Sequence, residues 1–470
     1  MKLVFGVKDR PKPGQIIVLA LQQMLAILAA TIAVPMIIGN GLTPAAAMFG
    51  AGCGSIVYLL FTQFKSPVFL GSSFAFIGSM FAAFAGGVSM SLGWLGLFLG
   101  ALFAGLVYVV IAIVIKFVGV GWLNKLMPPV VIGPTVALIG LSLAVNAVSD
   151  LTKGDVVNAA GEMLGSSYVA MLCGFITLAV TMLASTYGKG MVKLIPFIIG
   201  IISGYAAAAI FTIIGNTAGI DALKIVDFSV FSTYMFPDGT VSLNTFLSLP
   251  KFTFIGAIKG IPELNPSYVA TIFVAYVPVA FVVFAEHVAD HRNISSIIEH
   301  DLLEDPGLTR TLLGDGIGSI VGGFFGACPN TTYGESIACV AITGNAATVT
   351  ILAAAIGCVL FSFITPLIAL VDSIPACVMG GVCIALYGFI AVSGLKMLQQ
   401  VDLSKNRNLF VASCILVAGI GGLTIKVGAV TLTSIAAALI LGILTNIMLS
   451  KEKDETAADS ITNVKKKTKK

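Results

Sequence analysis

The chain has 470 residues, of which 57% are hydrophobic and only 10% are charged, and its formal net charge is +4. A soluble protein of this length would carry about a quarter of its residues as Asp, Glu, Lys or Arg, so most of this surface must face something other than water. The composition therefore excludes a soluble domain on a membrane anchor and predicts a membrane domain with short connections.

Apolar runs recur along the chain, and one membrane-spanning helix needs about 20 such residues. The third and tenth runs are too short and too rich in Gly, Ser, Thr and Asn for ordinary helices, so we expect short extended stretches in them. The fold class is therefore expected to be an all-α polytopic membrane protein with about 14 transmembrane segments. They lie at roughly 16–38, 45–63, 68–85, 92–118, 128–148, 167–187, 193–214, 267–289, 311–326, 334–349, 350–372, 375–394, 408–424 and 430–449.

Basic residues at both ends of the chain predict its orientation. Lys8, Arg10 and Lys12 precede the first run, and five lysines lie within 465–470. Because positive flanks stay in the cytoplasm, both termini are expected to be cytoplasmic, with an even number of crossings of the cytoplasmic (inner) membrane. The basic tail is interpreted as a solvated segment near anionic lipid rather than as a nucleic-acid-binding one.

The two halves of the chain share a pattern. Pro128 is followed five residues later by Gly133, as Pro375 is by Gly380. Coincidence between glycine-rich membrane helices is the alternative explanation of this spacing, but the polar segments 71–74 and 333–336 also occupy corresponding places. Seven segments per half imply opposite orientations, and inverted repeats with paired broken segments predict a secondary transporter whose site lies near the membrane midplane. We expect a first repeat at 1–214, an external connecting loop at 215–265, a second inverted repeat at 266–450 and a basic cytoplasmic tail at 451–470.

Acidic residues at membrane depth are the candidates for chemistry, because a central charge there costs about 2.5–3.5 kcal/mol or more. Glu286 ends an apolar run and Glu335 follows a broken segment. Each also has an alternative explanation without a functional role. Glu286 would then be a solvated residue at the membrane interface, and Glu335 would be a buried acid paired for packing. On a helix, Asp290 shares a face with Glu286, whereas His291 lies off that face.

The broken segments should supply hydrogen-bond donors to the same site. Gly71, Ser73 and Gly334, which follows Tyr333, free backbone amides from helical bonding, and such amides are tolerated at this depth only where they line a cavity or bind something. Two carboxylates and free N–H groups suit a small planar solute with alternating donors and acceptors. A carboxylate in a dry site can also take up a proton while the external side is open, which is the physical basis of proton coupling.

Three blocks, at 70–76, 285–288 and 329–335, resemble the nucleobase–ascorbate transporter family, and most closely its uracil-transporting members. Segments 301–308 and 375–388 are similar as well, so that the resemblance covers nearly all of residues 1–450. It implies seven-plus-seven inverted repeats divided between a core domain and a gate domain. It also implies that Glu286 and Glu335 hydrogen-bond a base, that the amides of Phe74 and Gly334 meet its carbonyls, and that Ala30, Tyr333 and, nearby, Tyr387 line the pocket.

This chain departs from the family pattern at three places. Gln22-Gln23 stands where many members have Gln-His, and Ser336 replaces the usual Asn after the motif Glu. At the position of Asp290 some members have His, whereas here His291 comes next. The proton-coupling set is therefore Glu286, Asp290, His291 and Glu335, and whether Asp290 or His291 relays the proton stays open.

The function expected is proton-coupled secondary active uptake of a nucleobase, with uracil as the first candidate. The alternatives are a xanthine or purine permease of the same family and an anion exchanger or channel of the same fold, although two acids in the site would repel an anion unless protonated. An enzyme is not expected, since no nucleophile triad, zinc motif or phosphate loop lies in a fitting context. No cofactor or metal is expected, because the proton gradient is the energy source for transport. The expected partners are the nucleobase, protons and the lipid bilayer, and a homodimer is left open.

Overall fold

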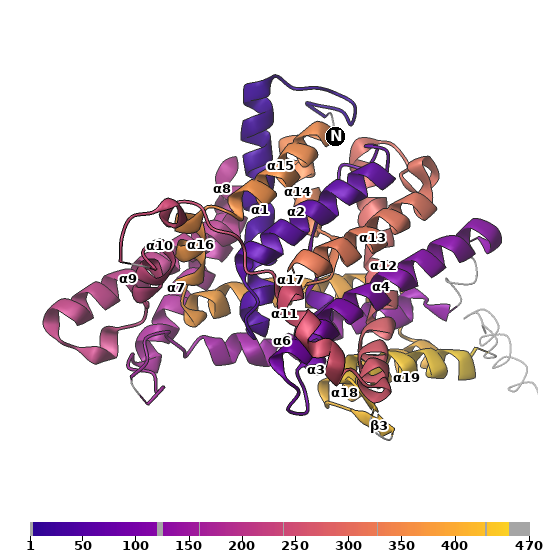
Figure 1. Ribbon diagram of the computed structural model, residues 1–470. Helices are drawn as coiled ribbons and strands as arrows, with labels where there is room; N and C mark the ends of the chain where they lie inside the picture. The colour runs from indigo at the N-terminus through magenta and orange to yellow at the C-terminus, as the bar shows by residue number, and fades with distance from the viewer. Residues whose placement is uncertain are drawn as a thin grey trace, which may run out of the picture.

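The computed structural model describes residues 3–119, 126–158, 160–237, 239–326, 328–427 and 430–450. These residues form a helical protein whose only strands are four pieces of three residues each (Figure 1). The expected all-α polytopic class is confirmed by helices long and apolar enough to cross a membrane. There are eight of these in the described part of the chain: α1 (Pro13–Ile38), α2 (Pro44–Phe61), α4 (Met90–Val118), α6 (Pro129–Asp150), α7 (Ser167–Tyr187), α9 (Pro196–Ala218), α12 (Pro266–Ile298) and α17 (Ala376–Leu398).

Shorter helices complete the described fold, and the basic tail predicted at 451–470 lies outside the described residues. The strands form two antiparallel pairs, β1 (Leu70–Ser72) with β2 (Asn330–Thr332) and β3 (Ile425–Val427) with β4 (Val430–Leu432). The shorter α-helices are α3 (Ile77–Ala83), α8 (Met191–Leu194), α10 (Ser229–Met235), α11 (Thr253–Ala257), α13 (Leu308–Gly326), α14 (Gly334–Thr343), α15 (Thr348–Phe361), α16 (Thr365–Asp372), α18 (Asn406–Ile420) and α19 (Ser434–Met448), and the 3₁₀ helix η1 spans Phe74–Phe76.

Several helix starts follow from local sequence signals. Proline occupies the first helical position of α2 and α12, where its missing N–H costs nothing. The side chain of Thr43 caps α2, and that of Asn265 caps α12 by accepting a hydrogen bond from the backbone N–H of Tyr268 at 2.9 Å. One expected span was wrong: 350–372 is two helices, because α15 ends at Phe361 and Pro366, in the first turn of α16, marks a new helix start.

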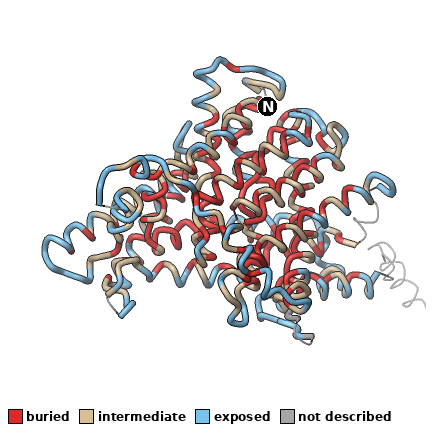
Figure 2. The backbone as a smooth tube through the Cα atoms, in the orientation of Figure 1, coloured by how far each residue is buried: buried red, intermediate tan, exposed pale blue. Residues whose placement is uncertain are grey.

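The helices pack into two bundles. The first bundle consists of α1, α2, α4, α12, α13 and α15, and the second bundle of α6, α7, α9, α17, α18 and α19. In Figure 1, α7 and α9 lie at the left and α18 and α19 at the lower right. Buried residues concentrate in the middle of the molecule, whereas the outlying end of α9 is exposed (Figure 2).

Glycines allow close helix contacts in the first bundle. A Cβ added at Gly50 of α2 would lie 2.5 Å from the carbonyl oxygen of Gly322 on α13, and one at Gly54 would lie 2.7 Å from that of Gly318. Small residues at such crossings let two backbones approach, which is a common way to associate helices in membranes. The contact fixes α13 against α2 and so holds the start of β2 beside β1.

Strands β1 and β2 replace helix at the two places where the sequence predicted broken segments. They pair antiparallel, with Leu70 opposite Thr332 and Ser72 opposite Asn330. The pairing satisfies backbone groups that would otherwise be unbonded in the middle of the bundle. Each strand is followed by a short helix, η1 and α3 after β1 and α14 after β2, so two helix starts face the interior of the protein.

Asp155, in the loop between α6 and α7, joins the two halves of the second bundle outside the spanning helices. Its Oδ1 accepts a hydrogen bond from the backbone N–H of Ala376 at the start of α17, at 3.2 Å. Burial raises the pKa of the Asp155 carboxyl from 3.8 to about 6, although the Ala376 bond acts in the opposite direction. Because the folded protein keeps this proton to a higher pH than the unfolded chain does, the folded state loses stability as pH rises from about 4 to about 6.

Replacing Asp155 with asparagine is expected to stabilise the protein at neutral pH. The amide oxygen can still accept from Ala376, and the cost of ionising a partly buried acid, about 2 kcal/mol, disappears. Thermal unfolding in detergent should show a midpoint several degrees above that of the wild type at neutral pH and no difference near pH 4. Asp221→Asn, which alters a surface ion pair with Lys224, is the control. An equal gain from Asp155→Asn at both pH values would contradict the role of ionisation.

Candidate functional site

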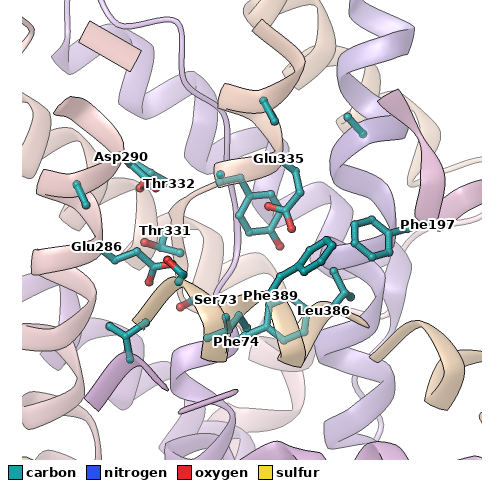
Figure 3. A pocket seen from close by; sticks show the side chains of 18 of the residues that line it. Ser73, Phe74, Phe197, Glu286, Asp290, Thr331, Thr332, Glu335, Leu386 and Phe389 are labelled. Carbon is teal, nitrogen blue, oxygen red and sulfur yellow. Dashed lines mark hydrogen bonds between the residues drawn. The ribbon is translucent and has the colours of Figure 1, made fainter. Parts of the chain in front are cut away.

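A cavity of about 450 Å³ lies between the two bundles, beside the paired strands. On one side it is lined by residues of α1 and α12 of the first bundle and of the neighbouring η1, β2 and α14. On the other side it is lined by residues of α6, α7, α9 and α17 of the second bundle and by Lys193 of α8. The acidic residues lie on the side of α12 and α14, and Phe197, Leu386 and Phe389 of the second bundle lie at the other side (Figure 3). A solute in this cavity would therefore contact both bundles at once.

Three acidic side chains line the cavity. Glu286 and Asp290 are one turn apart on α12, and Glu335 lies in the first turn of α14 (Figure 3). Thr332 Oγ1 of β2 donates a hydrogen bond to Asp290 Oδ2 at 2.6 Å. This bond fixes Asp290 to the strand, while Glu286 and Glu335 reach the cavity from different elements.

Two helix starts bring backbone amides to the same place. The Ser73 N–H donates to the carbonyl of Pro329 at 2.9 Å, and the Tyr333 N–H donates to that of Phe69 at 3.2 Å. The next residues, Phe74 and Gly334, begin η1 and α14, and the first amides of a helix have no intrahelical partner. The positive ends of both helices thus point towards the cavity, a placement that favours ligand oxygen atoms.

Tyr333 forms the wall between the two helix starts. Its hydroxyl donates to the carbonyl of Ser72 at 2.8 Å. Its ring lies against Gly71, where a Cβ would meet ring atoms of Tyr333. Gly71 is therefore required for close approach of the ring, and this contact fixes the orientation of Tyr333.

Most of the site residues expected from the sequence are brought together here. The cavity is lined by Ser73, Phe74, Glu286, Asp290, Tyr333, Gly334 and Glu335. Ala30 and Tyr387 do not line it: Ala30 packs in the buried cluster behind Tyr333, and the ring of Tyr387 lies 5.9 Å from that of Phe74.

His291 lies outside the cavity, in contact with α2. It is fully buried; its Nε2 is hydrogen-bonded to the hydroxyl of Tyr58 at 2.6 Å, and its Nδ1 to the carbonyl of His287 at 2.8 Å. The Tyr58 hydroxyl also bonds to Ser66 at 2.7 Å. The structure therefore separates Asp290, which lines the cavity, from its neighbour His291.

A further buried acid behind the site was missed from the sequence. Asp315 of α13 is fully buried, and its Oδ2 lies 2.7 Å from Nδ1 of His287. The Nε2 of His287 lies 3.1 Å from the hydroxyl of Thr311. The sequence did contain a signal for it. Asp315 lies inside the expected span 311–326, and an ionisable residue inside a span is a functional candidate by default.

The cavity combines hydrogen-bond acceptors, donors and apolar walls. In the described part of the chain, no group of three or more His, Cys, Asp or Glu side chains could hold a metal ion. A cavity lined by carboxylates and by the first amides of two helices can bind the N–H and C=O edges of a small planar molecule. Two bundles with paired broken helices and a site between them define the class of secondary transporters.

The comparison with known proteins identifies the family. Residues 14–428 match the family model Xan_ur_permease, described as "Permease family", so the chain belongs to this permease family and is a transport protein rather than an enzyme. The membership of the nucleobase–ascorbate transporter group that its motifs predicted is thereby confirmed.

Individual relatives agree with the family, and a solved structure shares the fold. The chain is 37% identical over 464 residues to the uracil permease of Bacillus subtilis (strain 168), covering 98% of both chains. It is 35% identical over 440 residues to the uracil permease of Escherichia coli (strain K12), covering 93% of this chain and 92% of that protein. Its fold is similar to that of the transmembrane domain of the cyanobacterium bicarbonate transporter BicA, with a TM-score of 0.60 at 13% identity over 94% of this chain and 99% of that one.

Proposed function

We propose that the chain takes up a nucleobase, and uracil first, across the cytoplasmic membrane by proton-coupled secondary active transport. The observation that carries the proposal is the single cavity that is lined by Glu286 and Glu335 and by Phe74 and Gly334, the first residues of η1 and α14. Relatives named uracil permeases match the chain over nearly its full length, which supports the choice of base.

In the proposed binding mode, the carboxyl groups, the backbone amides and the tyrosine ring each contact a different part of the base. Glu286 and Glu335 accept from, or in the protonated form donate to, the polar edge of the base. The amides of Phe74 and Gly334 donate to its carbonyl oxygens. Tyr333 contacts the ring of the base, Ala30 supports Tyr333 from behind, and Tyr387 packs against Phe74. Such pairing rejects solutes that lack the matching edge, because the buried groups of the site would be left without partners.

The proposed topology has fourteen segments with both termini in the cytoplasm. The eight long helices are joined by five shorter apolar helices, of which two follow β1 and β2, and by α13. We assign the first inverted repeat to 1–214 and the second to 266–450, with the external connection at 215–265. Motion of one bundle against the other around the cavity would expose it to each side in turn.

An anion exchanger is the weaker candidate despite the shared fold. At 13% identity, the similarity to a bicarbonate transporter concerns the fold alone. Three acidic side chains and one basic side chain, Lys193, line the cavity of this chain, and the excess of acidic groups opposes an anion. A fused-ring purine remains the rival within the family, because the cavity is larger than a single six-membered ring.

The proposed function is tested by uptake of labelled uracil and labelled xanthine into cells without their own carriers. Uptake of uracil should exceed that of xanthine, rise as external pH falls and collapse with a protonophore. Sodium-dependent uptake that survives the protonophore would contradict proton coupling, and faster uptake of xanthine would assign the chain to purines.

Asp290, rather than His291, is proposed as the proton-coupling neighbour of Glu286. Asp290 lines the cavity, whereas His291 is bonded to Tyr58 outside it. Uptake by the Asp290→Asn variant is expected to lose most of its dependence on external pH, and His291→Gln should keep the wild-type pH profile. A flat profile for His291→Gln beside a normal one for Asp290→Asn would reverse the assignment.

A further inference from the structure

The cavity reaches the surface of the protein at one end. It follows one face of α14 from Glu335 in the first turn to Ile342 in the last, and it follows α17 to Met397 in its last turn. Ser185, in the last turn of α7, lines the same end. Ile342 is 42% exposed and Phe389 of α17 is 58% exposed. The described conformation is therefore open at the end where α7, α14 and α17 finish.

The connections at this open end are basic. Lys189 and Lys193 lie between α7 and α9, and Lys396, Lys405 and Arg407 lie between the last turn of α17 and the first turn of α18. Because basic connections stay in the cytoplasm, this end is the cytoplasmic one in the proposed topology. The described conformation then corresponds to the inward-facing state of the transport cycle.

Lys193 brings a positive charge to the mouth of the cavity. Among the described residues that line the cavity, it is the one basic side chain, and the other charged ones are Glu286, Asp290 and Glu335. Lys193 is exposed, and it forms no ion pair with a carboxylate of the described residues. It belongs to α8, which is connected to the second bundle and lies beside α14 and α1.

Glu335 is the acid that Lys193 is placed to meet. Glu335 lies on α14, next to α8, whereas Asp290 already accepts a hydrogen bond from Thr332. The ammonium group of lysine is carried on a flexible stem of four carbons, so it can follow a partner over several ångströms. When the mouth closes, the second bundle moves onto the face of α14 that carries Glu335, and Lys193 moves with it.

The return of the empty protein creates the need for such a partner. After the base and the proton leave on the cytoplasmic side, Glu335 remains as a carboxylate. Closing the mouth removes this carboxylate from water, and a buried charge without a partner is strongly unfavourable. In the loaded protein the carboxyl group holds its proton and the base, so no counter-charge is required.

We propose that Lys193 is a gate residue that pairs with Glu335 when the empty protein closes to the cytoplasm. This inference rests on the proposed function and topology. The pair neutralises Glu335 during the return step and separates when a proton and a base bind from the outside. Lys193 is therefore required for the return of the empty protein but not for movement of the loaded one.

The test compares net uptake with exchange in proteoliposomes that hold equal amounts of folded protein. Net uptake of labelled uracil driven by a proton gradient includes the empty return, whereas exchange of labelled for unlabelled uracil at equal pH does not. In Lys193→Gln, net uptake should fall about tenfold or more while the exchange rate stays within about threefold of the wild type. Lys193→Arg keeps the charge and should keep both rates.

Lys189→Gln is the matched control, because Lys189 is an exposed lysine of the same connection that does not line the cavity. Both of its rates should equal those of the wild type. If Lys193→Gln is not recovered as folded protein, Lys193→Met, which is also neutral and of similar length, takes its place in the same comparison.

Three results would overturn the gate: an equal loss of net uptake and exchange in the neutral variant, no loss of either, or a loss of net uptake that Lys193→Arg shares. Each of these leaves uracil transport by the wild type intact. Absence of both net uptake and exchange in the wild type would instead overturn the proposed function.

Discussion

Uptake of labelled uracil is expected to fall at least about 100-fold in Glu335→Gln and in Glu286→Gln, because hydrogen bonds to a charged group are the strong ones in a dry site. Both carboxyl groups line the cavity from different elements, α14 and α12. Glutamine keeps the length of the side chain but cannot exchange a proton, so it removes both the acceptor pair and the coupling. The measurement is initial uptake per amount of protein in the membrane.

The control for this prediction is Glu263→Gln, since Glu263 is exposed in the connection that precedes α12. It should transport as the wild type does, and all three variants should be folded in equal amounts. Wild-type uptake by either cavity variant would remove that residue from the proposed site. Loss of the variant protein from the membrane would instead mean that the residue is needed for packing, which is the alternative explanation given for Glu335 in the sequence analysis.

Local signals in the sequence were sufficient to locate the broken segments. Gly71 and Pro329 are poor helix residues, and their polar neighbours can pair only as extended chain, so β1 and β2 lie where the spans were predicted to break. By contrast, the break within 350–372 was missed. Hydropathy is continuous across it, and only Pro366 at the start of α16 marks the second helix.

Site residues were predictable where one element carries its own signal. The acids of α12 and the start of α14 were predictable in this way. The partners of His287 and His291 do not, because Asp315 and Tyr58 come from other helices, and which face of α12 meets them depends on tertiary packing. Helical periodicity placed His291 off the face of Glu286 but could not identify its partner on α2.

The crossing of α6 and α17 carries the second large expected effect, because these helices support the apolar wall of the cavity. A Cβ added at Gly394 of α17 would lie 2.8 Å from the Cα of Ala137 on α6 and would also meet its backbone nitrogen. From the other side, a Cβ at Gly133 would lie 2.9 Å from the carbonyl oxygen of Gly394. The two backbones touch, so no flexible side chain can move aside to make room.

Gly394→Ala is therefore expected to destabilise the protein by about 3 kcal/mol or more, at the upper end for overpacking of a close contact. Folded protein recovered from membranes should fall several-fold, and the thermal midpoint of the remainder should fall with it.

Gly388→Ala on the same helix is the matched control, because a Cβ there meets nothing within 4 Å. Alanine also has the higher helix propensity, so this variant should be neutral or slightly more stable. Equal behaviour of the two variants would mean that α6 and α17 can separate without loss of stability. In that case the wall that they form across the cavity from Glu286 and Glu335 would not be rigid enough to select a base by its shape.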